Sequence, residues 1–150
     1  MSVTIYIPRD SGALALGAEK VAQAIEKEIA ARGLDARIVR NGSRGAYFLE
    51  PMVEVDAGSG RVAYGPVTAK DVPSLFDAGL TSGGAHGLSL GNPEEIPFFA
   101  KQTRLTFARC GLADPLSLDD RVELAQWADG DGISLAFLVD GRTTAYAAVR

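Results

Sequence analysis

The strongest periodic pattern of apolar and polar residues lies between residues 13 and 33 and predicts an amphipathic helix. Apolar residues recur there at intervals of three and four, while charged residues and glutamine occupy the opposite face. The apolar positions are Leu14, Ala18, Val21, Ala22, Ile25 and Ile29. Asp10 or Ser11 can cap the start of this helix, and Gly33 can adopt the left-handed conformation that ends it.

Strands are predicted on both sides of the helix, at residues 3–7 and 34–40. The first run is rich in β-branched and aromatic residues, and it ends at Pro8, which cannot donate to a sheet ladder. The apolar side of the second run consists of Leu34, Ala36 and Ile38. A strand, a helix and a strand in this order favour two parallel neighbouring strands.

Two hairpins are predicted farther along the chain. Residues 52–55 and 61–64 flank a glycine-bearing loop of about five residues, and this hairpin adds an antiparallel edge to the sheet. Residues 133–139 and 142–149 flank Asp140-Gly141, which is the strongest short hairpin signal in the sequence.

The segments between the hairpins predict a short helix, a connection and a second helix. Either Thr68 or Asp71 can cap the short helix, which ends at Gly79. Residues 81–95 are rich in glycine and predict an extended connection without a core of its own. Residues 96–107 predict a helix with a broad apolar side.

The loop at residues 41–47 connects the second predicted strand to the next extended run. Its glycines, Gly42 and Gly45, give the backbone access to positive φ, and a compact loop can present its N–H groups outward. Such a loop could hold an anion or a cofactor with the help of Arg44. The same composition is also that of a plain surface turn, so both interpretations stay open.

Composition and charge narrow the possible partners. In 150 residues with 47% hydrophobic content we expect one domain with appendages. Fifteen basic and nineteen acidic residues are scattered along the chain and leave a net charge of −4, so nucleic acid is not an expected partner. No apolar run is long enough for a membrane span, and the start lacks the features of a signal peptide. We therefore expect a cytoplasmic protein that does not bind membranes.

Candidate chemistry is sparse. Cys110 is the only cysteine and His86 the only histidine, so neither an internal disulfide nor a zinc, haem or iron–sulfur site is supported. We expect Cys110 to be a small packed residue and His86 to be a solvated loop residue. No glycine-rich nucleotide-binding motif follows a strand. The sequence predicts no catalytic, cofactor-binding or metal-ligating residue, and no activity for this chain alone.

Several motifs resemble a known family. Ile-Pro-Arg-Asp at residues 7–10, Arg-Asn-Gly-Ser-Arg-Gly at 40–45 and Gly-Pro-Val-Thr-x-x-Asp-Val-Pro at 65–73 are similar to the beta subunit of the NAD-dependent, molybdenum-containing formate dehydrogenases. The segments 96–104 and 109–120 resemble the join that leads into the flavin-binding domain of that family. The beta subunit is the NADH-binding flavoprotein of these complexes and is similar to the 51-kDa subunit of complex I. Its N-terminal domain is thioredoxin-like, and the resemblance covers residues 3 to about 120.

The resemblance implies an α/β fold of the thioredoxin-like, ferredoxin type with the order βαβββα. It divides the chain into a thioredoxin-like domain at 1–80, a linker at 81–95, a helical join at 96–120 and a divergent tail at 121–150 with the predicted hairpin. The expected function is that of a non-catalytic docking domain, in a complex that couples formate oxidation to NAD reduction. The partners implied are the other subunits of that complex.

Cluster-bearing relatives hold a [2Fe–2S] cluster with four cysteines, two in the loop after the first strand and two in the loop after the second. Those positions correspond here to Pro8, Ala13, Ser43 and Tyr47. None of these residues supplies a thiolate, so we expect no cluster and no other cofactor in this chain. The FMN, NAD and iron–sulfur centres of the full-length subunit are implied by the resemblance alone.

The same two loops supply the residues expected to dock. These are Arg9, Asn41, Ser43, Arg44 and Tyr47. Arginines can make charge-assisted hydrogen bonds to a partner, and a tyrosine supplies apolar contact area. The alternative function is a free-standing module that binds an anion or a small molecule, and it requires Arg9 and Arg44 to converge.

Overall fold

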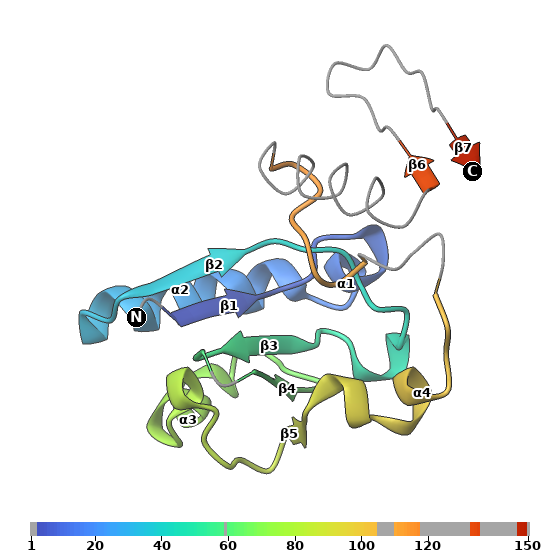
Figure 1. Ribbon diagram of the computed structural model, residues 1–150. Coiled ribbons are helices and arrows are strands. Elements are labelled where there is room, and N and C mark those ends of the chain that lie inside the picture. The colour runs from blue at the N-terminus through green and yellow to red at the C-terminus, as the bar shows by residue number, and fades with distance from the viewer. Residues whose placement is uncertain (1–2, 59, 105–109, 118–132, 136–146, 150) are drawn as a thin grey trace. The chain divides into compact units, whose positions relative to one another are not determined.

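The computed structural model describes residues 3–58, 60–104, 110–117, 133–135 and 147–149 of the chain (Figure 1). The chain divides into two compact units, residues 1–112 and 113–150. Among the described residues, no helix has the length and apolar character needed to cross a membrane.

The first unit is built on a five-stranded sheet with the order β2-β1-β3-β4-β5 (Figure 1). Its strands are β1 (Val3–Tyr6), β2 (Ala36–Val39), β3 (Val53–Asp56), β4 (Arg61–Tyr64) and β5 (Ser89–Gly91). β1 and β2 are parallel, whereas β1 and β3, β3 and β4, and β4 and β5 pair antiparallel. The parallel pair and the first hairpin predicted from the sequence are confirmed.

The long helix predicted from the sequence is two helices. α1 (Ser11–Ala15) and α2 (Ala18–Arg32) are separated at Gly17, where φ is +100°. A left-handed residue cannot continue a right-handed helix, which is why the helix breaks there. The prediction that Leu14 packs on the same inward face as the residues of α2 is wrong, because the helix breaks between them and the Leu14 side chain is 40% exposed.

The predicted ends of these helices agree with the structure. Asp10 is the N-cap of α1, since one oxygen of its carboxylate accepts from the amides of Gly12 and Ala13 at 3.0 and 3.2 Å. Gly33 ends α2 in the left-handed conformation with φ +61°.

The short helix α3 (Val72–Asp77) begins after Asp71, which resolves the choice between two caps. The side chain of Asp71 accepts no capping hydrogen bond from the amides of α3. Its carboxylate instead accepts from the amide and the hydroxyl of Thr68 at 2.8 and 2.6 Å. These bonds lower the pKa of Asp71 and fix the turn that leads into the helix.

The segment expected as an extended connection contributes a strand. Within residues 81–95, β5 pairs with β4, and two single 3₁₀ turns, η2 (Leu80–Ser82) and η3 (Pro93–Glu95), flank it. No alternation of apolar and polar residues predicts β5, because the strand is three residues long and ends in glycine. The domain boundaries suggested by the resemblance remain predictions.

The helix expected over residues 96–107 is shorter in the part that the structure describes. α4 (Pro97–Ala100) ends after one turn, and residues 105–107 lie outside the described residues. The side-chain nitrogen of Gln102 donates to the carbonyl oxygen of Phe98 at 2.9 Å. The backbone amide of Gln102 donates to the carbonyl oxygen of Phe99 instead. The side chain of Gln102 thus takes the carbonyl oxygen that its own backbone amide would bond if the helix continued, and the helix stops.

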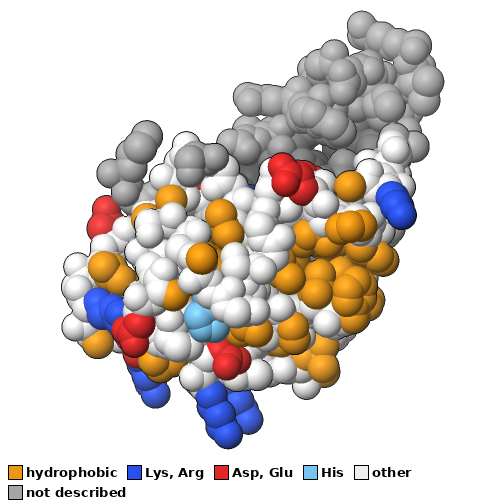
Figure 2. Space-filling view, turned by 90° about the horizontal axis from the view of Figure 1, so that it is seen from below, with side chains coloured by type: hydrophobic (Ala, Val, Ile, Leu, Met, Phe, Trp, Pro, Cys, Tyr) orange, Lys and Arg blue, Asp and Glu red, His pale blue; other side chains and the backbone are white. Residues whose placement is uncertain are grey.

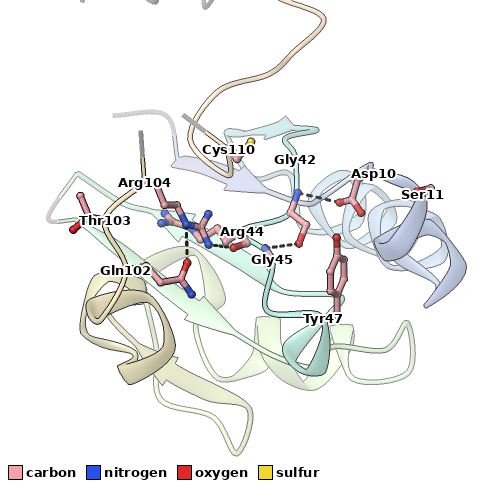
Figure 3. Close-up of a pocket in the computed structure, with 11 residues that line it drawn as sticks. Asp10, Ser11, Gly42, Arg44, Gly45, Tyr47, Gln102, Thr103, Arg104 and Cys110 are labelled. Atoms are coloured by element: carbon pink, nitrogen blue, oxygen red, sulfur yellow. Dashed lines mark hydrogen bonds between the residues drawn. The ribbon is translucent and has the colours of Figure 1, made fainter. Parts of the chain in front are cut away.

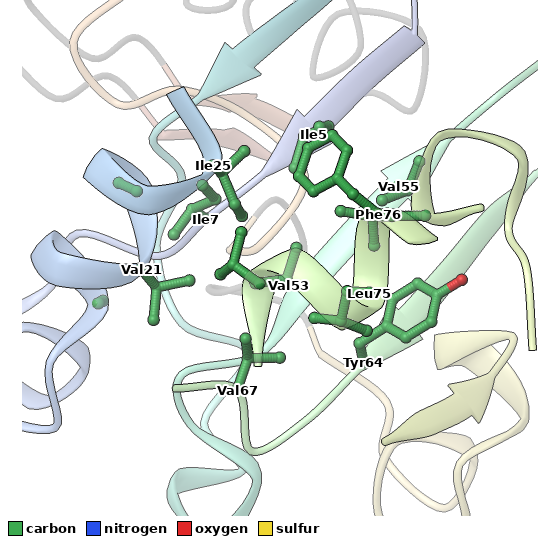
Figure 4. Packing of buried hydrophobic residues seen from close by; sticks show 14 of the residues in the cluster. Ile5, Ile7, Val21, Ile25, Val53, Val55, Tyr64, Val67, Leu75 and Phe76 are labelled. Atoms are coloured by element: carbon green, nitrogen blue, oxygen red, sulfur yellow. The ribbon is translucent and has the colours of Figure 1, made fainter. Parts of the chain in front are cut away.

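The main core lies between one face of the sheet and the helices α2 and α3 (Figure 4). Alternate residues of β1 and β3 face these helices, as the period of two in a strand requires. Fully buried members include Ile5, Ile7, Val21, Ile25, Val53, Val55, Tyr64 and Leu75. The opposite face of the sheet carries a second, smaller cluster, formed by Ala46, Met52, Ala63 and Phe99.

In the second unit, β6 (Ile133–Leu135) pairs antiparallel with β7 (Ala147–Val149). The C-terminal hairpin predicted from the sequence is confirmed for these strands. The predicted turn at Asp140-Gly141 lies outside the described residues.

Gly84 offers a test of the fold. A Cβ atom at this position would lie 1.8 Å from the carbonyl oxygen of Ala78, and the backbone there cannot move aside as a side chain could. We expect Gly84→Ala to lower the free energy of unfolding by about 2 kcal/mol or more. Gly87→Ala is the matched control, because a Cβ there meets no atom within 4 Å, and it should change stability by about 0.5 kcal/mol or less. Urea denaturation of both variants measures the difference, and equal midpoints would contradict the described packing.

Candidate functional site

The loops that follow β1 and β2 meet at one end of the sheet. The amide of Arg9 donates to the carbonyl oxygen of Asn41 at 2.8 Å, which extends the parallel ladder beyond the strands. The amide of Ser43 donates to the second carboxylate oxygen of Asp10 at 2.9 Å. The ring of Tyr47 packs over Gly12, where a Cβ atom would come within 2.8 Å of it.

A cavity of about 710 Å³ opens where these loops meet. Asp10 and Tyr47 line it from the two loops, and Arg104 and Cys110 line it from the segment after α4 (Figure 3). Arg104 donates to Gln102 at 3.1 Å and also to the carbonyl oxygen of Arg44. The guanidinium of Arg104 therefore closes the cavity wall and holds the loop backbone.

Arg44, which the sequence predicts as a docking residue, is buried. Its side chain is 7% exposed, and its Nε and Nη2 donate to the two carboxylate oxygens of Glu54 at 2.6 and 2.9 Å. Its Nη1 donates to Glu94 at 2.8 Å. Burial favours the neutral guanidine, but the hydrogen bonds and charges of Glu54 and then Glu94 outweigh it and raise the pKa of Arg44.

Glu54 is the residue that sequence reasoning missed. It lies in the middle of β3 on the face opposite the main core, and its side chain is 2% exposed. A second arginine, Arg61, reaches it at 3.2 Å and stacks its guanidinium 3.5 Å from the centre of the Tyr6 ring. Both oxygens of this buried carboxylate therefore accept hydrogen bonds from arginine side chains.

The buried charge cluster of Arg44, Glu54, Arg61 and Glu94 also holds the end of the first unit. Arg61 donates to the carbonyl oxygens of Gly111 and Leu112 at 2.8 and 3.1 Å. Asn41, 3% exposed, donates to the same Gly111 oxygen at 2.7 Å, while its own Oδ1 has no partner among the described residues. Asn41 therefore holds the backbone at Gly111, while the side chain of Arg44 is bound to Glu54 and Glu94.

Ser43 links the loop to a buried carboxyl group. Its hydroxyl donates to Glu50 at 2.7 Å, and the other oxygen of Glu50 accepts from the amide of Met52 at 2.8 Å. Burial raises the pKa of Glu50, the bonds from Ser43 and Met52 oppose this, and the charges of Asp10 and Glu54 add to it. The net effect is a pKa above 4.5.

The outer side of the loop is apolar. Tyr47 and Phe48 lie in η1 (Tyr47–Leu49) and are 60% and 66% exposed, and Phe98 of α4 is 40% exposed. The rings of Phe48 and Phe98 meet edge to face at 5.5 Å between centroids. Figure 2 shows hydrophobic side chains gathered on the side of the molecule where η1 and α4 lie. We call Tyr47, Phe48 and Phe98 the aromatic patch.

The remaining candidate residues are His86 and Cys110, and their surroundings indicate no reactive site. His86 accepts from the amide of Leu88 through Nδ1 at 3.2 Å, so in the neutral ring Nε2 carries the proton and faces Ser74. Ser74 itself donates to the carbonyl oxygen of Asp71. A histidine that donates to a serine cannot act as its base, so this trio is no nucleophile site. Cys110 is half-buried and lines the cavity as a free thiol.

The four positions that correspond to cluster ligands do not fit a cluster. Pro8 and Ala13 are buried and carry no donor atom, and Ala13 belongs to the main core. Ser43 is committed to Glu50, and the exposed Tyr47 is a phenol where a cluster needs a thiolate. Within the part of the chain that the structure describes, no three metal-ligating side chains come together.

Comparison with known proteins identifies the fold. No protein family model matches the chain, and no curated protein matches it in sequence. A thioredoxin-like [2Fe–2S] ferredoxin from Aquifex aeolicus superposes with a TM-score of 0.54 at 20% identity, over 64% of this chain and 96% of the ferredoxin. A cysteine-to-serine variant of that ferredoxin gives 0.51 at 24% identity, over 60% and 99% of the two chains. The α/β, thioredoxin-like fold predicted from the sequence is confirmed. These structures do not bear on formate dehydrogenase.

Glu50 provides a pH-dependent test of the site. A raised pKa in the folded state stabilises the protein below pH 4.5, and this contribution is lost as the pH rises through the folded pKa. Glu50→Gln cannot ionise and keeps only one acceptor oxygen where Glu50 uses two, which is an offset that does not change with pH. We expect the stability of the parent relative to Glu50→Gln to fall between pH 4 and pH 7.

Chemical denaturation at several pH values measures this difference. Glu26→Gln, which removes an exposed carboxylate from α2, serves as the control and should follow the parent. A difference between parent and Glu50→Gln that stays constant or grows with pH would contradict the described burial.

Proposed function

We propose that this chain is a non-catalytic docking domain of a redox complex. It has the fold of a thioredoxin-like [2Fe–2S] ferredoxin, and its resemblance to the beta subunit of NAD-dependent formate dehydrogenases supports the more specific proposal. In that complex the domain belongs to the NADH-oxidising flavoprotein subunit, in the cytoplasm, and its partners are the other subunits. The chain has no turnover of its own.

The observation that carries this proposal is the aromatic patch. Three large aromatic side chains stand exposed at the loop end of the sheet, and one of them, Tyr47, occupies a position that corresponds to a cluster ligand. Aromatic residues are enriched in the centres of protein interfaces, where they contribute a large part of the binding energy. Phe48 and Phe98 support each other through their ring contact, so the patch is shaped before a partner arrives.

The docking residues expected from the sequence are revised accordingly. Tyr47 remains in the proposed surface, and Arg9 is exposed at the same loop end. Ser43, Asn41 and Arg44 support the loop from inside. The alternative of an anion-binding module is not favoured, because Arg44 is bound to Glu54 and Glu94 and cannot converge with Arg9 on a ligand.

Titration with the remaining subunits of an NAD-dependent, molybdenum-containing formate dehydrogenase tests the proposal. We expect Phe48→Ser to weaken binding about tenfold or more, since losing one central aromatic side chain costs about 1.4 kcal/mol or more. Because Phe48 is 66% exposed, its removal should change the melting temperature little.

Isothermal titration calorimetry provides the affinities, and thermal melts verify folding. Lys27→Ser, an exposed position on α2, is the control and should bind like the parent. If Phe48→Ser and Phe98→Ser both bind as the parent does, the patch is not the docking surface. If the parent itself does not bind these subunits, the assignment to this complex fails.

A further inference from the structure

Asp10 connects two loops with one carboxylate. Its Oδ1 accepts from the amides of Gly12 and Ala13 at 3.0 and 3.2 Å and caps α1 within its own loop. Its Oδ2 accepts from the amide of Ser43, 33 residues away in the loop after β2, at 2.9 Å. Figure 3 draws this bond as a dashed line from Asp10 to the loop beside Gly42. The two oxygens of the side chain thus serve different tasks.

Ser43 carries the connection onward. Its Oγ accepts from the amide of Gly45 at 2.9 Å and donates to Glu50 at 2.7 Å. Glu50 in turn accepts from the amide of Met52, just before β3, at 2.8 Å. A continuous chain of hydrogen bonds therefore runs from the loop after β1, through the loop after β2, to the start of β3. Two of its members are carboxyl groups, which make strong bonds to N–H and O–H donors when ionised.

We infer that the hydrogen bonds of Asp10 and Ser43 act as a cross-link between the loops after β1 and β2. These are the two loops in which cluster-bearing relatives carry their metal ligands. A bound cluster would join these loops through its ligands, but the four corresponding residues here do not fit one. The hydrogen-bonded chain joins the same loops with atoms of the protein alone. This inference goes beyond the proposed docking function, because it states what fixes the loops whether or not a partner binds.

The cross-link makes Asp10 a positioning residue for the loop that carries Tyr47. The ring of Tyr47 already lies against Gly12, within the helix that Asp10 caps. Fixing Ser43 against Asp10 restricts the four residues up to Tyr47, and the bond from Gly45 to Ser43 shortens that span further. The loop should therefore keep its shape in metal-free protein.

Asp10→Asn separates the two tasks of this side chain. Asparagine caps a helix about as well as aspartate, so Oδ1 keeps its bonds to Gly12 and Ala13. The amide nitrogen that replaces Oδ2 is a donor and faces the donor amide of Ser43. We expect amide hydrogen exchange at Ser43, followed by NMR in the full chain, to become about tenfold faster or more. Exchange at Gly12 and Ala13 should change less than about threefold.

Two further variants keep the inference falsifiable. Asp10→Ser also caps a helix but is too short to reach Ser43, so it should reproduce the faster exchange. Asp56→Asn is the control, because Asp56 accepts from the amide of Gly58 in its own turn at 2.8 Å. It should leave Ser43 unaffected. Unchanged exchange at Ser43 in both Asp10 variants would overturn the inference.

An experiment with added iron and sulfide tests whether protein atoms alone join the two loops. Parent protein and Asp10→Asn are incubated with ferrous iron and sulfide under anaerobic conditions, and Ser43 exchange is measured again. We expect no change in either protein. If iron and sulfide slow Ser43 exchange in the variant to the parent level, a metal centre holds the loops and the inference is wrong. These readouts need no partner subunit, so they are independent of the docking experiment.

Discussion

The arrangement of the loop end depends on the buried ion pair between Arg44 and Glu54. Removing two charges from water is unfavourable, and close bidentate geometry with further hydrogen bonds is needed to offset it. The structure provides both, since two nitrogens of Arg44 meet both oxygens of Glu54, and Arg61 and Glu94 complete the cluster. Loss of one member would leave a buried charge without its partner.

The direction of Arg44 determines which side chains the loop presents. Because Arg44 points inward to β3, the chain reaches η1 with Tyr47 and Phe48 on the outside. The same cluster, through Arg61, holds the carbonyl groups of Gly111 and Leu112 and so positions the segment that carries Cys110 on the cavity wall. The loop therefore directs Arg44 to the inner polar cluster and continues into η1, where Tyr47 and Phe48 of the aromatic patch are exposed. The proposed docking surface follows from this division.

Local patterns were sufficient to predict the first two strands, the hairpins and a helix cap at Asp10 or Ser11, because each depends on residues close in sequence. The parallel pairing of the two strands followed from the strand–helix–strand order. The break at Gly17 was missed because glycine is tolerated in a periodic helical pattern and its φ is not visible in the sequence. Glu54 was missed for a different reason. Alternation in a strand does not distinguish a polar residue that faces water from one that faces a second layer of protein. Its partner Arg44 lies 10 residues away in a loop, and loop composition does not show which side chains turn into the protein.

A double-mutant cycle between Arg44 and Glu54 tests the central claim most directly. Arg44→Met keeps the apolar stem, and Glu54→Leu keeps a side chain of similar size, so each change mainly removes charge. The account predicts that each single variant loses about 3 kcal/mol of unfolding free energy, and that the two residues are coupled by about 2 kcal/mol or more. The double variant should then be more stable than the sum of the single effects implies. Additivity within about 0.5 kcal/mol in urea denaturation would contradict the claim that this pair fixes the loop.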